Sequence, residues 1–224
     1  MKEIDWCPSA EQVRCTLPHA FKIKYPTTYI IIDASELYLE TPTDLVLQSS
    51  TWSNYKQHNT SKYLVGVTPN GAISFISPAY VGSISDPELT RCSGLLSKLE
   101  GKENISVMAD RGFTIRDQLQ DIGVKLNIPP FLDGRKQLTP GEVLQGRSIA
   151  SLRIHVERAI GRMKNFTILK GVFPINMARL TNQIVSVCAW LTNFFPPLVP
   201  PPTDKETVDD SSSSEDEDSD LEGV

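Results

Sequence analysis

The stretch "YIIIDASEL", residues 29–37, carries the strongest strand signal in the chain. Three consecutive isoleucines precede an alternation of apolar and polar residues, a pattern typical of a buried β-strand. An acid, Asp33, follows the isoleucines directly. The later stretch "SVMADRGF", residues 106–113, repeats the arrangement, because a short apolar run ends at Asp110 and a turn follows. Two strands with an aspartate after the buried run indicate carboxylates that the fold brings together.

The segments around these strands predict a mixed α/β domain with a central sheet and covering helices. Residues 41–61 contain turn formers without a clean period and predict a loop. Residues 62–80 predict a hairpin that turns at Asn70 and Gly71. The other predicted elements are a helix over 85–101, a short helix over 114–123, a strand over 124–131, a long helix over 139–166 and an apolar helix over 177–195.

Length and composition exclude several classes of protein. The chain has 224 residues, of which 40% are hydrophobic, as in a soluble protein with one domain of ordinary size. It contains no run of about 18 apolar residues, so no membrane span is predicted. The N-terminal residues contain no apolar signal segment. The four cysteines form no CxxC pair, which argues against a zinc site and favours a reducing compartment.

The net charge of −5 hides two parts of opposite sign. Ten acidic residues and one lysine lie from Thr203 onward, leaving 21 basic and 17 acidic residues before it. We therefore expect a lead-in segment over 1–26, a folded domain over 27–198 and a tail over 199–224. The tail is proline-rich, then acidic and serine-rich, which predicts disorder.

The positions of the two aspartates predict a cation site. A strand that returns through a helix lies near its partner, so Asp33 and Asp110 are expected on neighbouring strands. Two carboxylates a few ångströms apart destabilise each other unless a positive charge lies between them. A divalent metal ion such as Mg²⁺ supplies that charge and prefers oxygen ligands.

A third acid, Glu157, lies in the most basic segment of the chain. It is the only acid between Gly146 and Lys170, and it adjoins the apolar stripe through Val156 and Ile160. The basic residues around it are Arg147, Arg153, Arg158, Arg162, Lys164 and Lys170. Basic side chains on a helix beside a metal site would bind a phosphate backbone by charge.

Each of these residues also has a simpler interpretation. An aspartate at a strand end is more often a turn or cap residue than a ligand. Glu157 would pair with Arg153 at i,i+4 on the helix surface. The basic run would then be a solvated helix face, and His58 and His155 would be hydrogen-bonded or exposed. The ordered set of an acid on the first strand, an acid on a later strand and an acid on a basic helix favours the functional interpretation.

These residues resemble the catalytic domain of DDE-superfamily transposases of the Harbinger type, which is found also in THAP-associated proteins. The resemblance rests on "YIIIDASEL", residues 52–86, "VMADRGF" and "RIHVERAIGRMKNF", and covers roughly residues 20–195. It implies an α/β fold with an RNase H-like mixed sheet flanked by helices. It also implies a catalytic and metal-binding triad of Asp33, Asp110 and Glu157 that binds two divalent ions, Mg²⁺ or Mn²⁺.

The resemblance further implies phosphoryl transfer on DNA, in the nucleus, with one ion activating a water or 3′-hydroxyl and the other stabilising the leaving oxygen. Phosphate contacts are expected from Arg153, Arg158, Arg162 and Lys164. Relatives usually carry an upstream DNA-binding module, which the sequence does not show, so a separate DNA-binding partner and a homodimer are further expectations. Arg111 departs from the small polar residue that many relatives have after the second aspartate.

Two alternatives stay open from the sequence. One is a domesticated transposase-derived protein that keeps the acids and serves as a DNA-binding or scaffold protein without cleavage. The other is a structural α/β domain with an acidic interaction tail.

Overall fold

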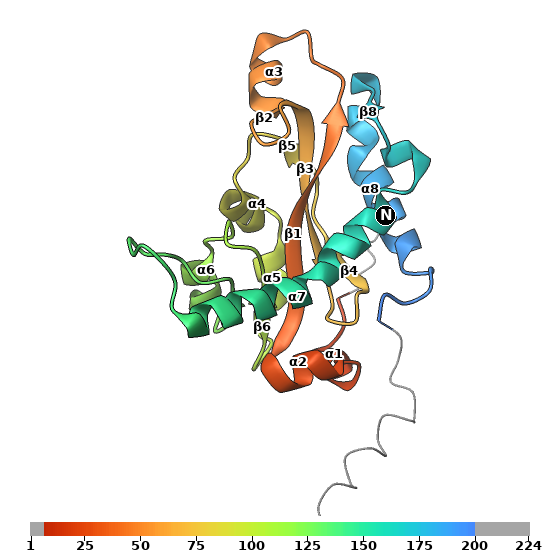
Figure 1. The fold of residues 1–224 in the computed structure, drawn as a ribbon. Coiled ribbons are helices and arrows are strands. Elements are labelled where there is room, and N and C mark those ends of the chain that lie inside the picture. Colours follow the sequence, from red (N-terminus) through yellow and green to blue (C-terminus); the bar gives the residue numbers. More distant parts are fainter. Residues whose placement is uncertain (1–6, 200–224) are drawn as a thin grey trace, which may run out of the picture.

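The computed structural model describes residues 7–199, which are built around one mixed sheet (Figure 1). Its central strand is β1 (Thr28–Leu39). On one side β3 (His58–Val67) runs antiparallel to β1, and β4 (Ile73–Ile76) runs antiparallel to β3. On the other side β6 (Ser106–Met108) and β7 (Lys125–Asn127) run parallel to β1. Antiparallel strands followed by parallel ones confirm the predicted RNase H-like mixed sheet.

Three short strands extend this sheet. β2 (Trp52–Ser53) and β5 (Tyr80–Val81) pair with β3, and β8 (Val172–Phe173) pairs with the far end of β1. The predicted hairpin is the β3–β4 pair. Gly71 turns it with a φ of 90°, and its N–H donates to the Thr68 carbonyl at 2.8 Å. A positive φ suits glycine because it has no Cβ.

Helices cover both faces of the sheet (Figure 1). One face packs against α7 (Pro140–Met163) and α8 (Thr181–Thr192). The opposite face packs against α4 (Asp86–Cys92), α5 (Leu95–Leu99) and α6 (Arg116–Asp121).

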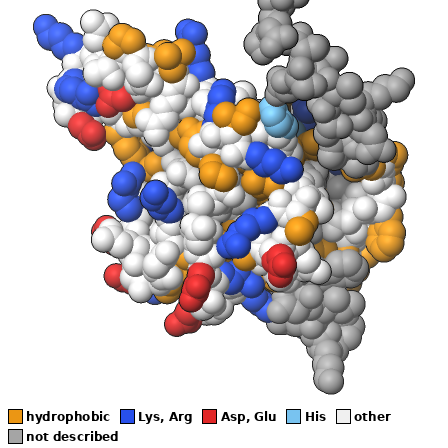
Figure 2. All heavy atoms as spheres, turned by 90° about the horizontal axis from the view of Figure 1, so that it is seen from below, with side chains coloured by type: hydrophobic (Ala, Val, Ile, Leu, Met, Phe, Trp, Pro, Cys, Tyr) orange, Lys and Arg blue, Asp and Glu red, His pale blue; other side chains and the backbone are white. Residues whose placement is uncertain are grey.

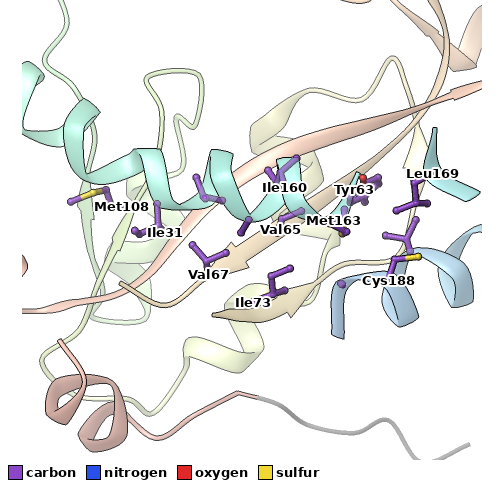
Figure 3. Close-up of a cluster of buried hydrophobic side chains, with 14 of the residues drawn as sticks. Ile31, Tyr63, Val65, Val67, Ile73, Met108, Ile160, Met163, Leu169 and Cys188 are labelled. Carbon is purple, nitrogen blue, oxygen red and sulfur yellow. The ribbon is translucent and has the colours of Figure 1, made fainter. Parts of the chain in front are cut away.

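Figure 3 shows the first face, where Ile160 and Met163 of α7 lie over Tyr63 and Val65 of β3. Full burial of each aliphatic side chain contributes about 1.5–3 kcal/mol, so this packing fixes α7 on the sheet.

Local sequence sets the start and the rotation of α7. Thr139 caps it, since its Oγ1 accepts from the Glu142 N–H at 3.3 Å, while the Glu142 carboxylate accepts from the Thr139 N–H at 2.8 Å. This reciprocal capping box fixes the first turn. All five residues of the predicted apolar stripe are buried: Ile149, Leu152, Val156, Ile160 and Met163.

Two expectations about secondary structure are wrong. Residues 41–61 contain α3 (Leu45–Thr51), β2 and the first residues of β3 instead of a loop. Asp44 starts α3 by accepting from the Leu47 N–H at 2.9 Å. Leu45 and Val46 are exposed, so this helix has no buried apolar stripe that a sequence period would indicate. The single helix expected over 85–101 is divided into α4 and α5, because Gly94 between them adopts a φ of 81°.

The segment before β1 and the segment after α7 contain further helices. α1 (Ala10–Cys15) and α2 (His19–Lys24) bury Val13 and Phe21 against the sheet, which the sequence did not predict because each helix is too short to show a period. The 3₁₀ helices η1 (Thr167–Leu169) and η2 (Ile175–Leu180) lie between α7 and α8.

No helix among residues 7–199 is both long and apolar enough to cross a membrane. Cys15, Cys92 and Cys188 are free thiols. The predicted disorder of the tail falls almost wholly on residues 200–224, which lie outside the described residues.

Candidate active site

The pairing of β1 with β6 brings two predicted site residues to the same edge. Ile31 lies opposite Met108 in this parallel pair. Asp33 lies two residues further along β1, and Asp110 follows the end of β6 by two residues, so both lie just beyond the last pair of β1 with β6. The expectation that the strands that precede these two acids are neighbours is confirmed.

The third acid reaches this edge from α7. Val156 is fully buried under the helix, and the adjacent Glu157 lies at the border of the buried stripe. The Glu157 side chain is 58% exposed and the Asp110 side chain 54% exposed, whereas Asp33 is partly buried. The three acids thus combine one sheltered carboxylate with two that are open to solvent.

Arg153 lies where the acids converge. Its guanidinium Nη1 is 3.1 Å from Asp110 Oδ1, and its Nη2 is 4.0 Å from Glu157 Oε1. The i,i+4 pairing that the sequence left open is therefore present, but the shorter contact is the one to Asp110, across the fold. The Arg153 side chain is only 9% exposed, so this arginine turns inward from the helix.

Burial raises the pKa of Asp33, whereas the positive charge of Arg153 lowers it. The Asp33 pKa is raised from 3.8 to about 6, chiefly by desolvation on burial and to a smaller extent by the negative charges of Asp110 and Glu157. The Arg153 guanidinium and a 2.9 Å hydrogen bond from the Ala34 N–H lower the pKa without offsetting burial. All three acids and Arg153 are thus close enough to form one electrostatic unit.

Lys164 belongs to the rim of the same unit. It is half-buried just after α7, and it follows Glu157 by seven residues, which places both on one helix face. Burial lowers the pKa of Lys164, and the Lys56 ammonium lowers it further, whereas Glu36 and Asp33 raise it. Sequence reasoning placed Lys164 on a DNA-binding face and missed its proximity to the first strand's acids.

The donor set suits a hard divalent cation. Its three carboxylates supply only oxygen, the ligand type that Mg²⁺ and Mn²⁺ select. Among residues 7–199, however, no three His, Cys, Asp or Glu side chains are gathered tightly enough to hold an ion. The three carboxylates fit such a cation in chemistry and charge. In this structure the positive charge beside them is the Arg153 guanidinium.

The four residues expected to contact DNA phosphates do not form one surface. Arg158 is exposed. Arg162 is partly buried and donates through Nη1 to the Pro196 carbonyl, and Lys164 is half-buried. The expectation for Arg153 needs correction, because its side chain is buried and paired with Asp110. Helix rotation is the physical reason, since the stripe that buries Val156 also turns Arg153 toward the sheet.

A second polar group, which the sequence did not reveal, lies beside the turn after Asp110. Lys62 Nζ is 2.7 Å from Asp86 Oδ1 and donates to the Ile84 carbonyl at 3.0 Å. Asp86 Oδ2 would lie 3.2 Å from a Cβ at Gly112. The glycine of "DRGF" therefore leaves room for Asp86, while the Arg111 guanidinium lies 5.9 Å from the centre of the Phe131 ring.

Comparison with known proteins adds a family. Residues 32–193 match the family described as DDE superfamily endonuclease, and this range contains all three acids. Among solved structures, the chain is similar to the catalytic domain of Mos1 mariner transposase, with a TM-score of 0.33 and 10% identity. That similarity covers 86% of this chain and 96% of the other. No curated protein matches the chain.

Proposed function

Because the chain belongs to the DDE superfamily endonucleases, we propose that it cuts DNA by metal-dependent phosphoryl transfer, with Asp33, Asp110 and Glu157 as the catalytic and metal-binding acids. One observation carries this proposal. Arg153 pairs with Asp110 and approaches Glu157, and its charge also acts on Asp33, so acids from three distant parts of the chain share one positive charge. An acid cluster at the edge of a sheet costs stability, and binding a cation is a function that explains it.

The three carboxylates have different parts in this chemistry. Bound Mg²⁺ or Mn²⁺ ions would activate the attacking water or 3′-hydroxyl and stabilise the leaving oxygen. Asp33 is the sheltered ligand, held by the Ala34 N–H on the rigid central strand. Asp110 and Glu157 lie at the solvent side, where a phosphate backbone has access. None of the three attacks phosphorus, since each is needed as a carboxylate ligand.

DNA is the proposed substrate, bound mainly through phosphates. Lys and Arg side chains occur in several separate groups on the face seen from below in Figure 2, not in one continuous stripe. Arg158 is the exposed basic residue of α7 next to Glu157, and we assign it a phosphate contact. Such contacts give affinity without reading sequence, so we propose a separate DNA-binding partner that supplies target specificity. A homodimer and a nuclear location are also part of the proposal.

Nicking of supercoiled plasmid tests this function. The protein is expected to convert the plasmid to open circles with Mg²⁺ or Mn²⁺ and not with EDTA. Asp33→Asn, Asp110→Asn and Glu157→Gln should each lower the rate by more than about a hundredfold, above the loss seen for residues that only support a ligand. Asp121→Asn, on an exposed acid of α6, is the matched control and should leave the rate unchanged. Equal rates in the three variants and the control would refute the triad.

A second function is favoured by the pairing of Arg153. Its guanidinium already neutralises Asp110 and approaches Glu157, as in a protein that keeps the acids for structure and serves as a DNA-binding or scaffold module. Binding of plasmid DNA without any metal-dependent nicking would favour this alternative.

A further inference from the structure

The position of Arg153 has a consequence for any cation that binds the acid cluster. Its Nη1 lies within hydrogen-bonding distance of Asp110 Oδ1, at 3.1 Å. A Mg²⁺ ion contacts its carboxylate ligands at about 2.0–2.1 Å. The guanidinium and the ion would therefore compete for the same Asp110 oxygen. Two positive charges a few ångströms apart also repel each other unless water screens them.

Arg153 is also incompletely satisfied where it lies. Its Nε is buried and has no hydrogen-bond partner among residues 7–199. Its Nη2 reaches Glu157 only at 4.0 Å, which is too long for a hydrogen bond. A buried donor without a partner is costly, so the cluster holds this guanidinium for its charge more than for its geometry.

Resting on the proposed function, we propose that Arg153 is the resident counter-charge of the acid cluster, and that a divalent cation binds by displacing its guanidinium from Asp110 and Glu157. Arg153 is then a positioning residue that sets the metal affinity of the site. It keeps the three acids together in the metal-free protein and makes them available only at sufficient metal concentration.

Calorimetric titration of Mn²⁺ into the full chain, without DNA, tests this inference. Arg153→Gln removes the competing charge and should tighten Mn²⁺ binding about tenfold, since charge-assisted contacts to carboxylates are the strong ones. Arg153→Lys keeps the charge but cannot bridge two acids, so its affinity should lie between. Arg147→Gln, on an exposed arginine of the same helix, is the matched control and should change affinity less than about twofold.

A measurement on the unmutated chain covers the case in which Arg153→Gln does not fold. The ¹⁵N resonance of the Arg153 guanidinium should shift as Mg²⁺ is added, with the same midpoint as a calorimetric titration of Mg²⁺ into the same chain. Unchanged or weaker Mn²⁺ binding in folded Arg153→Gln, or a guanidinium resonance that does not move at saturating Mg²⁺, would overturn the displacement. If the wild type and Arg153→Gln bind Mn²⁺ equally well, the displacement is wrong and the proposed function is left intact. If neither the wild type nor any variant binds Mn²⁺, the displacement and the proposed function are both overturned.

Discussion

Asp33→Asn is expected to stabilise the metal-free protein at neutral pH. Desolvation by burial raises the pKa of Asp33 from its ordinary 3.8 to about 6. The folded protein therefore binds this proton more tightly than the unfolded chain. The resulting loss of stability is absent below about pH 4, grows as the pH rises between the two values and is complete above pH 6. Asparagine has nearly the same shape but no charge to desolvate.

The size of the effect follows from the shift. Each pKa unit corresponds to about 1.4 kcal/mol, so a rise from 3.8 to about 6 corresponds to roughly 3 kcal/mol at pH 7.5. The asparagine oxygen can still accept from the Ala34 N–H, so that hydrogen bond is kept. For a domain of this size, 1 kcal/mol shifts the melting temperature by about 2–4 °C. The variant should thus melt roughly 6–12 °C above the wild type.

Thermal unfolding in EDTA at pH 7.5 and at pH 4 provides the assay. The difference between variant and wild type should be large at pH 7.5 and close to zero at pH 4. The charges that face Asp33 are those of Arg153, Glu157 and Lys164 from α7 and its C-terminal end, and of Asp110 from the end of β6.

Asp110→Asn is the informative contrast. It breaks the 3.1 Å pair with Arg153 and should not raise stability, because Asp110 is largely solvated. A melting temperature that falls for Asp33→Asn at pH 7.5 in EDTA would refute the reasoning. It would show that the Asp33 charge supports the fold.

Three further outcomes are expected. Arg158→Gln should reduce the log–log salt slope of DNA binding by about one, as measured by fluorescence anisotropy, and an unchanged slope would remove Arg158 from the interface. Deletion of residues 203–224 should raise DNA affinity at low salt and not at high salt, because a tethered acidic segment competes for a basic surface; equal affinity at low salt would contradict this competition. Gly82→Ala should lower stability by about 1–3 kcal/mol, because its Cβ would lie 2.1 Å from Thr60 Oγ1 and 2.5 Å from the Thr51 carbonyl oxygen. Gly141→Ala, which meets nothing within 4 Å, is the control in urea unfolding and should not destabilise.

Much of the architecture could be predicted from sequence because it depends on local pattern. The isoleucines before Asp33 define the central strand, Asn70 and Gly71 define a hairpin, and the stripe through Val156 defines the buried face of α7. Helix α3 could not be predicted in this way, because Asp44 starts it by capping alone and its apolar residues are exposed.

The order of the acids along the chain is likewise a property of the sequence, whereas their electrostatic environment depends on the tertiary structure. Asp110 and Arg153 are 43 residues apart, and only the parallel pairing of β6 with β1 and the packing of α7 on the sheet bring them to 3.1 Å. Arg153 and Arg158 look equivalent in the sequence, yet one is buried against the acids and the other faces solvent. The reason is that a helix turns by about 100° per residue, so the rotation fixed by its buried stripe decides which charges meet the sheet and which meet water.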